Sequence, residues 1–143
     1  MTKIVINKCY GGFGLSEEGV LRYLEIKGQK VWPEYNKRFN LLGPTYWLVP
    51  PGPDRVEEAD DKWHSMTMEE RQAHNDRWSK QVFYDREVAR DDPVLAQVVE
   101  ELGDQANGRH ASLKVVEIPN DVRWTIEEYD GTEWVSEVHR TWE

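Results

Sequence analysis

Apolar positions fall into distinct patterns along the chain, and each pattern predicts an element. Positions 4–6 are apolar in succession, which is typical of a strand covered on both faces, so we expect a strand over 3–8 that lies inside a sheet. Apolar residues then recur at helical spacing and predict a helix over 16–27 that stops at Gly28. Prolines and glycines interrupt the following stretch, which we interpret as an irregular insert at about 29–66.

The middle of the chain carries local start signals for two further helices. A capping box predicts a helix over 67–80, whose thin apolar face indicates a surface position. The Asp-Pro pair at 92–93 supplies an N-cap and a first helical residue, and a clean apolar stripe follows as far as Gly103. Short strands are expected at 45–49 and 81–85.

The last third of the chain predicts β structure. We expect a strand over 112–118 and a hairpin of 123–129 and 132–139, joined by an Asp-Gly type I′ turn. The element order predicts an α+β fold in one domain of residues 1–143. In that fold two main helices pack on a mixed sheet of about five strands, with an irregular proline-rich insert and a C-terminal β-hairpin.

Net charge, cysteine count and the lack of long apolar stretches limit the kinds of partner and compartment that we expect. The 27 acidic and 18 basic residues give a net charge of -9, which repels a phosphate backbone, so we expect no direct nucleic-acid binding. The same acidity fits plain solubility, a basic protein partner or mimicry of DNA charge. Cys9 is the one cysteine, which excludes an internal disulfide and indicates a reducing compartment. Neither a membrane span nor a signal-peptide pattern is seen, so we expect a cytoplasmic protein with no membrane partner.

A glycine-rich corner follows the first predicted strand and precedes the first predicted helix. Successive backbone N–H groups ahead of a helix N-terminus can cradle a phosphate or a carboxylate. The dinucleotide fingerprint is incomplete, since Glu17 stands where its third glycine belongs, and a tight structural turn is the alternative. The candidate ligand-binding residues at this corner are Asn7, Cys9, Tyr10, Gly11, Gly12, Phe13, Gly14 and Ser16.

The inner face of the predicted hairpin supplies the second half of the candidate site. The two-residue turn fixes the register, places Trp124 opposite Glu137, and puts His139 on the same face. In the functional interpretation, an aromatic base stacks on Trp124 while Glu137 or His139 hydrogen-bonds its edge. In the structural alternative, the strand leaves the core after Val135, or the two polar side chains satisfy each other.

No pattern indicates a catalytic or metal centre. Cys9 lies at a strand end near a helix terminus, which can activate a thiol, but no sequence signature supplies a base. His64, His74 and His110 lack the spacing of a zinc site. The mixed charges at 85–92 are interpreted as helix capping and local ion pairs. We therefore expect no enzyme activity, no cofactor and no metal.

Three segments of the chain form a combined pattern. They are KIVINKCYGGFGLS at 3–16, the Arg-Asp-Asp-Pro helix that ends in VVEELG at 98–103, and IEEYDGTEWVSEVHR at 126–140. Together they resemble a family of small uncharacterised proteins encoded by tailed bacteriophages. The resemblance covers residues 1–28 and roughly 85–143, and it implies expression in the cytoplasm of an infected bacterium. It implies no reaction and carries over no catalytic residues.

The leading functional hypothesis is a non-catalytic phage-encoded binding protein. By analogy with counter-defence factors, it would sequester a nucleotide-like immune signal, with the glycine corner on the phosphate and Trp124, Glu137 and His139 on the base. One alternative is an acidic protein-binding inhibitor of a host protein, such as a host defence protein, with DNA mimicry as one mode of action. The weaker alternative is a small enzyme using Cys9 or His139. Homo-oligomerisation stays open.

Overall fold

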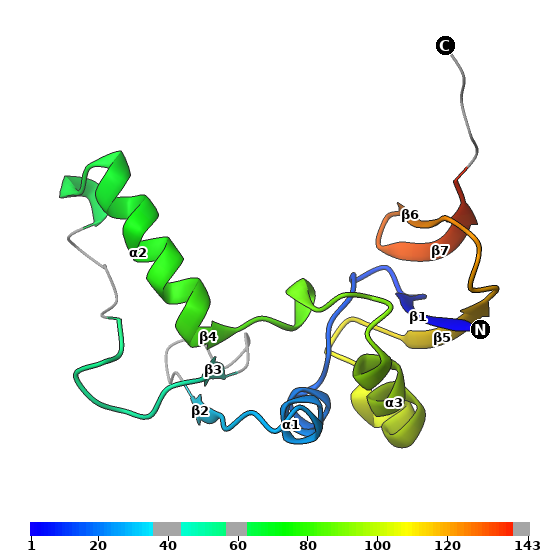
Figure 1. Ribbon diagram of the computed structural model, residues 1–143, viewed down its shortest axis with the longest axis horizontal. Helices are drawn as coiled ribbons and strands as arrows, with labels where there is room; N and C mark the ends of the chain where they lie inside the picture. The colour runs from blue at the N-terminus through cyan, green and yellow to red at the C-terminus, as the bar shows by residue number, and fades with distance from the viewer. Residues whose placement is uncertain (36–43, 57–62, 139–143) are drawn as a thin grey trace, which may run out of the picture. The chain divides into compact units, whose positions relative to one another are not determined.

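The structure is a computed structural model, and it describes residues 1–35, 44–56 and 63–138 (Figure 1). The chain folds into two compact units. Met1–Lys27 and Asp85–Glu143 form one unit, called here the main unit, and Gly28–Tyr84 form the other, called the small unit. We expected a single domain with an insert at 29–66, and the small unit extends past that insert to include the predicted 67–80 helix.

The predicted α+β class is confirmed, with three α-helices and seven strands in the described residues. The strands form three small antiparallel sheets, of two, three and two strands. The expectation of one mixed sheet of about five strands is therefore wrong in its detail.

The main unit is built around β1 (Thr2–Asn7) and β5 (Leu113–Ile118), which pair antiparallel from end to end. The helices α1 (Glu17–Ile26) and α3 (Pro93–Leu102) pack against each other, and α3 also packs against β1. Its largest fully buried apolar side chains are Ile4, Val5, Val20, Leu95 and Val98. The core therefore lies between this strand pair and the two helices.

The expected position of β1 inside a sheet is wrong, because β5 is its one strand partner in the described part of the chain. The residues at its second edge are nevertheless buried. Continuous apolar sequence indicates burial on both faces, but it does not say what covers each edge.

The predicted helix caps of the main unit are confirmed. The Ser16 hydroxyl accepts a hydrogen bond from the Gly19 N–H, as an N-cap does. Asp92 caps α3 by accepting from the Val94 N–H at 2.8 Å, with Pro93 as the first helical residue.

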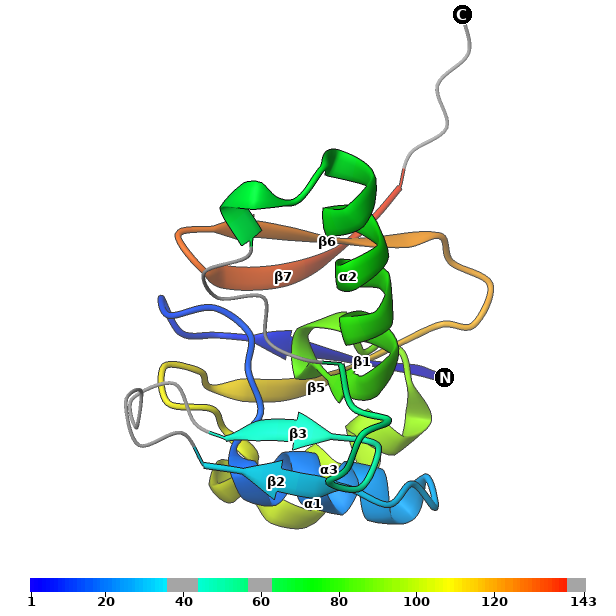
Figure 2. The same cartoon turned by 90° about the vertical axis from the view of Figure 1, so that its left-hand side faces the viewer.

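The C-terminal hairpin consists of β6 (Trp124–Tyr129) and β7 (Thr132–Glu137). Its turn residues have φ of 51° at Asp130 and 89° at Gly131, as a type I′ turn requires, so the predicted turn is confirmed. The predicted pairing of Trp124 with Glu137 is also confirmed. Figure 2 shows β7 lying between β6 and β1.

The small unit contains a sheet in the order β2 (Trp32–Glu34), β3 (Thr45–Trp47) and β4 (Val82–Phe83), together with α2 (Met68–Gln81). Its buried core residues are Trp47, Val56 and Val82. The side chains of α2 are at least partly exposed, as its thin apolar face predicted. Strand β2 was not expected because it contains Pro33, which is tolerated since β2 lies at an edge.

Short 3-10 helices, η2 (Trp63–Ser65), η3 (Asp85–Glu87) and η4 (Gly103–Ala106), complete the described elements. No helix in the described residues is both long enough and apolar enough to cross a membrane.

Candidate functional site

Asn7, the first of the predicted ligand-binding residues, is fully buried and fully engaged by the protein itself. Its amide nitrogen donates to the carbonyl oxygens of Cys9 at 2.7 Å and Gly131 at 2.9 Å. Its amide oxygen accepts from the backbone N–H groups of Cys9 at 3.2 Å and Ser112 at 2.9 Å. These four bonds exhaust the side chain, so Asn7 joins the corner, the start of β5 and the hairpin turn.

The glycines of the corner allow segments of the chain itself to approach closely. A Cβ atom at Gly11 would overlap the Cβ and carbonyl oxygen of His110, and one at Gly131 would overlap the carbonyl oxygen of Tyr10. Gly12 has a φ of 90°, which favours glycine. The geometry thus matches the structural alternative, in which glycine serves a tight turn.

Two backbone donors directly before α1 also have protein partners. The Leu15 N–H donates to the Asp85 carboxylate at 2.7 Å, and the Ser16 N–H donates to the Ala106 carbonyl at 2.9 Å. We predicted an anion beside the N-terminus of this helix. A carboxylate does lie there, but it is the side chain of Asp85 and not a bound ligand. Each fully buried side-chain nitrogen and oxygen atom in the described residues has a hydrogen-bond partner.

Other residues of the predicted site differ in exposure. Phe13 is buried, and the Arg90 guanidinium lies 3.8 Å from the centroid of its ring. Cys9 is partly buried, whereas the Tyr10 side chain is 75% exposed. Gly14 accepts, through its carbonyl oxygen, a hydrogen bond of 2.8 Å from the Gly108 N–H.

The polar centre of the main unit is Glu133, which the sequence interpretation did not select. The residue is 5% exposed, and its two carboxylate oxygens accept from the Arg90 guanidinium at 2.6 and 2.9 Å. The Asn7 N–H adds a third bond of 2.8 Å. Burial alone would raise the pKa of Glu133, but the hydrogen bonds from Arg90 and Asn7 and the charge of Arg90 hold that pKa below its ordinary value.

This ion pair closes the second edge of β1. The Val5 N–H donates to the Arg90 carbonyl at 2.8 Å, and the Arg90 guanidinium donates to the Val5 carbonyl at 3.2 Å. Since the Asn7 N–H is bound by Glu133, side-chain and loop atoms occupy the place that a further strand would take. We interpreted the charges at 85–92 as local pairs, and for Arg90 that was wrong. One feature of the sequence does point to Glu133, since strand alternation places it on the same inward face of β7 as Val135.

The structure does not bring the two halves of the predicted site together. Gly131, at the turn, contacts the corner, whereas Trp124 and Glu137 lie at the other end of the hairpin. The five residue steps between these ends correspond to about 17 Å. Glu137 is exposed, as in the alternative in which the strand leaves the core after Val135. His139 lies outside the described residues.

The outer face of the hairpin presents exposed aromatic and acidic side chains. Tyr129 is 76% exposed and Trp134 is 41% exposed. The Trp134 indole N–H donates to the Glu127 carboxylate at 2.9 Å, and the Ser136 hydroxyl donates to the same oxygen at 2.7 Å. We call the outer side chains of β6 and β7, centred on Glu127, Tyr129 and Trp134, the outer hairpin face.

Charge in the hairpin is of one sign. Residues 124–137 contain five carboxylates and no lysine or arginine. Burial of Glu133 leaves four exposed carboxylates, which belong to Glu127, Glu128, Asp130 and Glu137. This segment is therefore a local source of negative potential.

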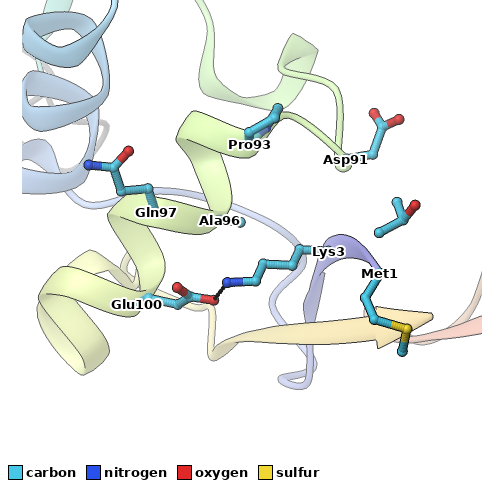
Figure 3. Close-up of a pocket in the computed structure, with 8 residues that line it drawn as sticks. Met1, Lys3, Asp91, Pro93, Ala96, Gln97 and Glu100 are labelled. Atoms are coloured by element: carbon cyan, nitrogen blue, oxygen red, sulfur yellow. Dashed lines mark hydrogen bonds and ion pairs between the residues drawn. The ribbon is translucent and has the colours of Figure 1, made fainter. Parts of the chain in front are cut away.

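A separate hollow of about 580 Å³ lies between the start of β1 and α3 (Figure 3). Pro93 and Ala96 line it from α3, and Lys3 and Glu100 pair across it at 2.7 Å. None of the predicted site residues lines this hollow. Among the described residues, no group of three or more histidine, cysteine or acidic side chains is arranged to hold a metal ion.

Comparison with protein-family models, with curated proteins and with solved structures finds no match for this chain.

Proposed function

We propose that this chain is a non-catalytic binding protein that engages a basic segment of a partner protein through the outer hairpin face. The observation that carries the proposal is the exposure of Tyr129 and Trp134 on one face with the Glu127 carboxylate, in a hairpin that has four exposed carboxylates and no basic residue over 124–137. Tyrosine and tryptophan, together with arginine, are enriched among the residues that dominate protein interfaces.

Lysine and arginine are the complementary side chains for such a face. A cation gains from carboxylates and also from the faces of tyrosine and tryptophan rings. The net charge of -9 adds long-range attraction, which accelerates encounter with a basic partner.

The partner we propose is a host protein in the bacterial cytoplasm, in keeping with the resemblance to phage proteins. The role is then that of an acidic inhibitor in counter-defence, where carboxylates take the place of DNA phosphates on a basic surface. A nucleotide-like ligand at the glycine corner has less support, because Asn7, Leu15 and Ser16 direct their polar groups to protein partners.

The proposal is tested with the full chain and synthetic peptides in a calorimetric titration. A peptide of alternating lysine and valine should bind, with affinity that falls as salt is raised, whereas the serine–valine and glutamate–valine peptides should not. Equal binding of the lysine and serine peptides, or binding of neither, would overturn the proposal.

Matched variants locate the surface. The double variant Glu127→Gln and Glu128→Gln removes the exposed charge of β6 on the outer hairpin face and the neighbouring charge on its other face. It should weaken binding of the lysine peptide about fivefold, since two exposed charge contacts contribute about 1 kcal/mol. Glu69→Gln with Glu70→Gln, an adjacent exposed pair on α2, is the control and should leave affinity unchanged. Equal weakening by the two double variants would place the interaction elsewhere.

A further inference from the structure

We infer that the basic segment binds as an added strand along the outer edge of β6. This inference deepens the proposed function and depends on it. It concerns the backbone of β6, whereas the proposed function concerns the side chains of the hairpin.

The hydrogen-bonding register shows which β6 groups point outward. The Val138 N–H donates to the Arg123 carbonyl at 2.9 Å, so this pair is a hydrogen-bonded one. Hydrogen-bonded and non-hydrogen-bonded pairs alternate along an antiparallel ladder. The backbone groups of Trp124, Ile126 and Glu128 therefore point away from β7 and towards the outer edge.

This edge is open in the part of the chain that the structure describes, where β6 pairs with β7 alone. The opposite side of the hairpin is engaged, since the Glu133 carbonyl accepts from the Lys8 ammonium at 3.2 Å. The second edge of β1 is closed by Arg90 and Glu133. In Figure 2, β6 accordingly forms the outer border of the β1, β7 and β6 layer.

The six residues of β6 are long enough for stable strand addition, because natural strands are commonly five or six residues long. Three outward-facing residues each offer one N–H donor and one carbonyl acceptor to an incoming strand. Main-chain bonds supply affinity in this mode, and side chains of the added strand supply specificity.

Charge selects the occupant. Strand β6 carries Glu127 on one face and Glu128 on the other, with no basic side chain. A second copy of this chain would place like charges against each other, which is unfavourable between neighbouring strands. An extended segment with lysine or arginine instead places opposite charges beside both glutamates.

Alternate N-methylation of the lysine–valine peptide tests the binding mode on the unmodified full chain. A methyl group on an amide removes a donor and blocks the approach of a strand, and successive amides point to opposite edges. One peptide is methylated at each valine and the other at each lysine, so charge and sequence are the same. We expect one of the two to lose affinity at least about tenfold and the other to bind as the parent does.

Amide exchange measured by NMR supplies the second readout. The parent peptide should slow exchange at Trp124, Ile126 and Glu128, whose N–H groups face the added strand. Equal affinity of both methylated peptides without such slowing would overturn strand addition and leave the proposed function standing. Absence of any lysine-peptide binding would overturn both, and dimerisation of the free chain through β6 would overturn the assignment of the occupant.

Discussion

Replacing Glu133 by glutamine should remove a large part of the stability of the main unit. The change preserves size but removes the charge and replaces one acceptor oxygen by an amide group. Glu133 accepts three hydrogen bonds, two of them from Arg90, at a site that is 5% exposed. Hydrogen bonds to charged groups contribute about 1.5–3 kcal/mol, and breaking a buried pair costs about 3–5 kcal/mol. Because glutamine retains one acceptor, we expect Glu133→Gln to cost about 2–4 kcal/mol.

The control lies directly opposite on the neighbouring strand. Glu128 pairs with Glu133 across the hairpin but is exposed, so Glu128→Gln should change the free energy of unfolding by less than about 0.5 kcal/mol. Urea denaturation gives both values, with NMR signals of Val5 and Leu95 reporting the core of the main unit. Equal losses in the two variants would refute the assignment of Glu133 as the buried centre that fastens the hairpin to β1.

Three further results are expected. The pKa of Glu133 lies below its ordinary 4.5, so the stability that the ionised carboxylate contributes is present above pH 4.5 and is lost as the pH falls through the folded-state pKa. The free energy of unfolding should therefore fall less steeply with acid in Glu133→Gln than in the wild type, and identical pH profiles would contradict this. Gly11→Ala should destabilise by several kcal/mol because its Cβ would overlap a neighbouring loop, whereas Gly14→Ala, which meets ordinary contacts, should cost about 1 kcal/mol or less in thermal unfolding. Tyr23→Phe should reduce the free energy of unfolding by about 1 kcal/mol, because the 2.7 Å hydrogen bond to Asp92 is lost. Burial and this hydrogen bond raise the pKa of Tyr23, so the stability that its hydroxyl contributes is present below about pH 10 and is lost as the pH rises further. Alkaline unfolding curves should show this loss in the wild type and not in the variant.

Features set by neighbouring residues were predictable from the sequence. Ser16 precedes the first helix with a side chain that reaches the Gly19 N–H, and Asp92 precedes a proline that fixes a helical φ. The Asp130-Gly131 turn likewise determines the pairing of the hairpin strands. In each case the required partner lies within a few residues.

Features set by distant residues were not predictable. Arg90 and Glu133 are 43 residues apart, and their pairing depends on where the hairpin meets β1. The inward face of β7 was predicted, but alternation alone does not show that Glu133 is buried and Glu137 exposed, because both have the same parity. Gly11 did not distinguish a ligand site from a tight turn, because the lack of a Cβ allows close approach of a ligand or of a neighbouring loop, and here that neighbour is His110.

The most direct test of the binding proposal is a map of amide and indole NMR shifts during titration of the full chain with the lysine–valine peptide. We predict that the shifts concentrate on β6 and on the Trp134 indole N–H, which is bound to Glu127, while Asn7 and Leu15 stay unchanged. Shifts centred on Asn7 and Leu15, with Trp134 unmoved, would contradict the account and return the glycine corner to the role of ligand site.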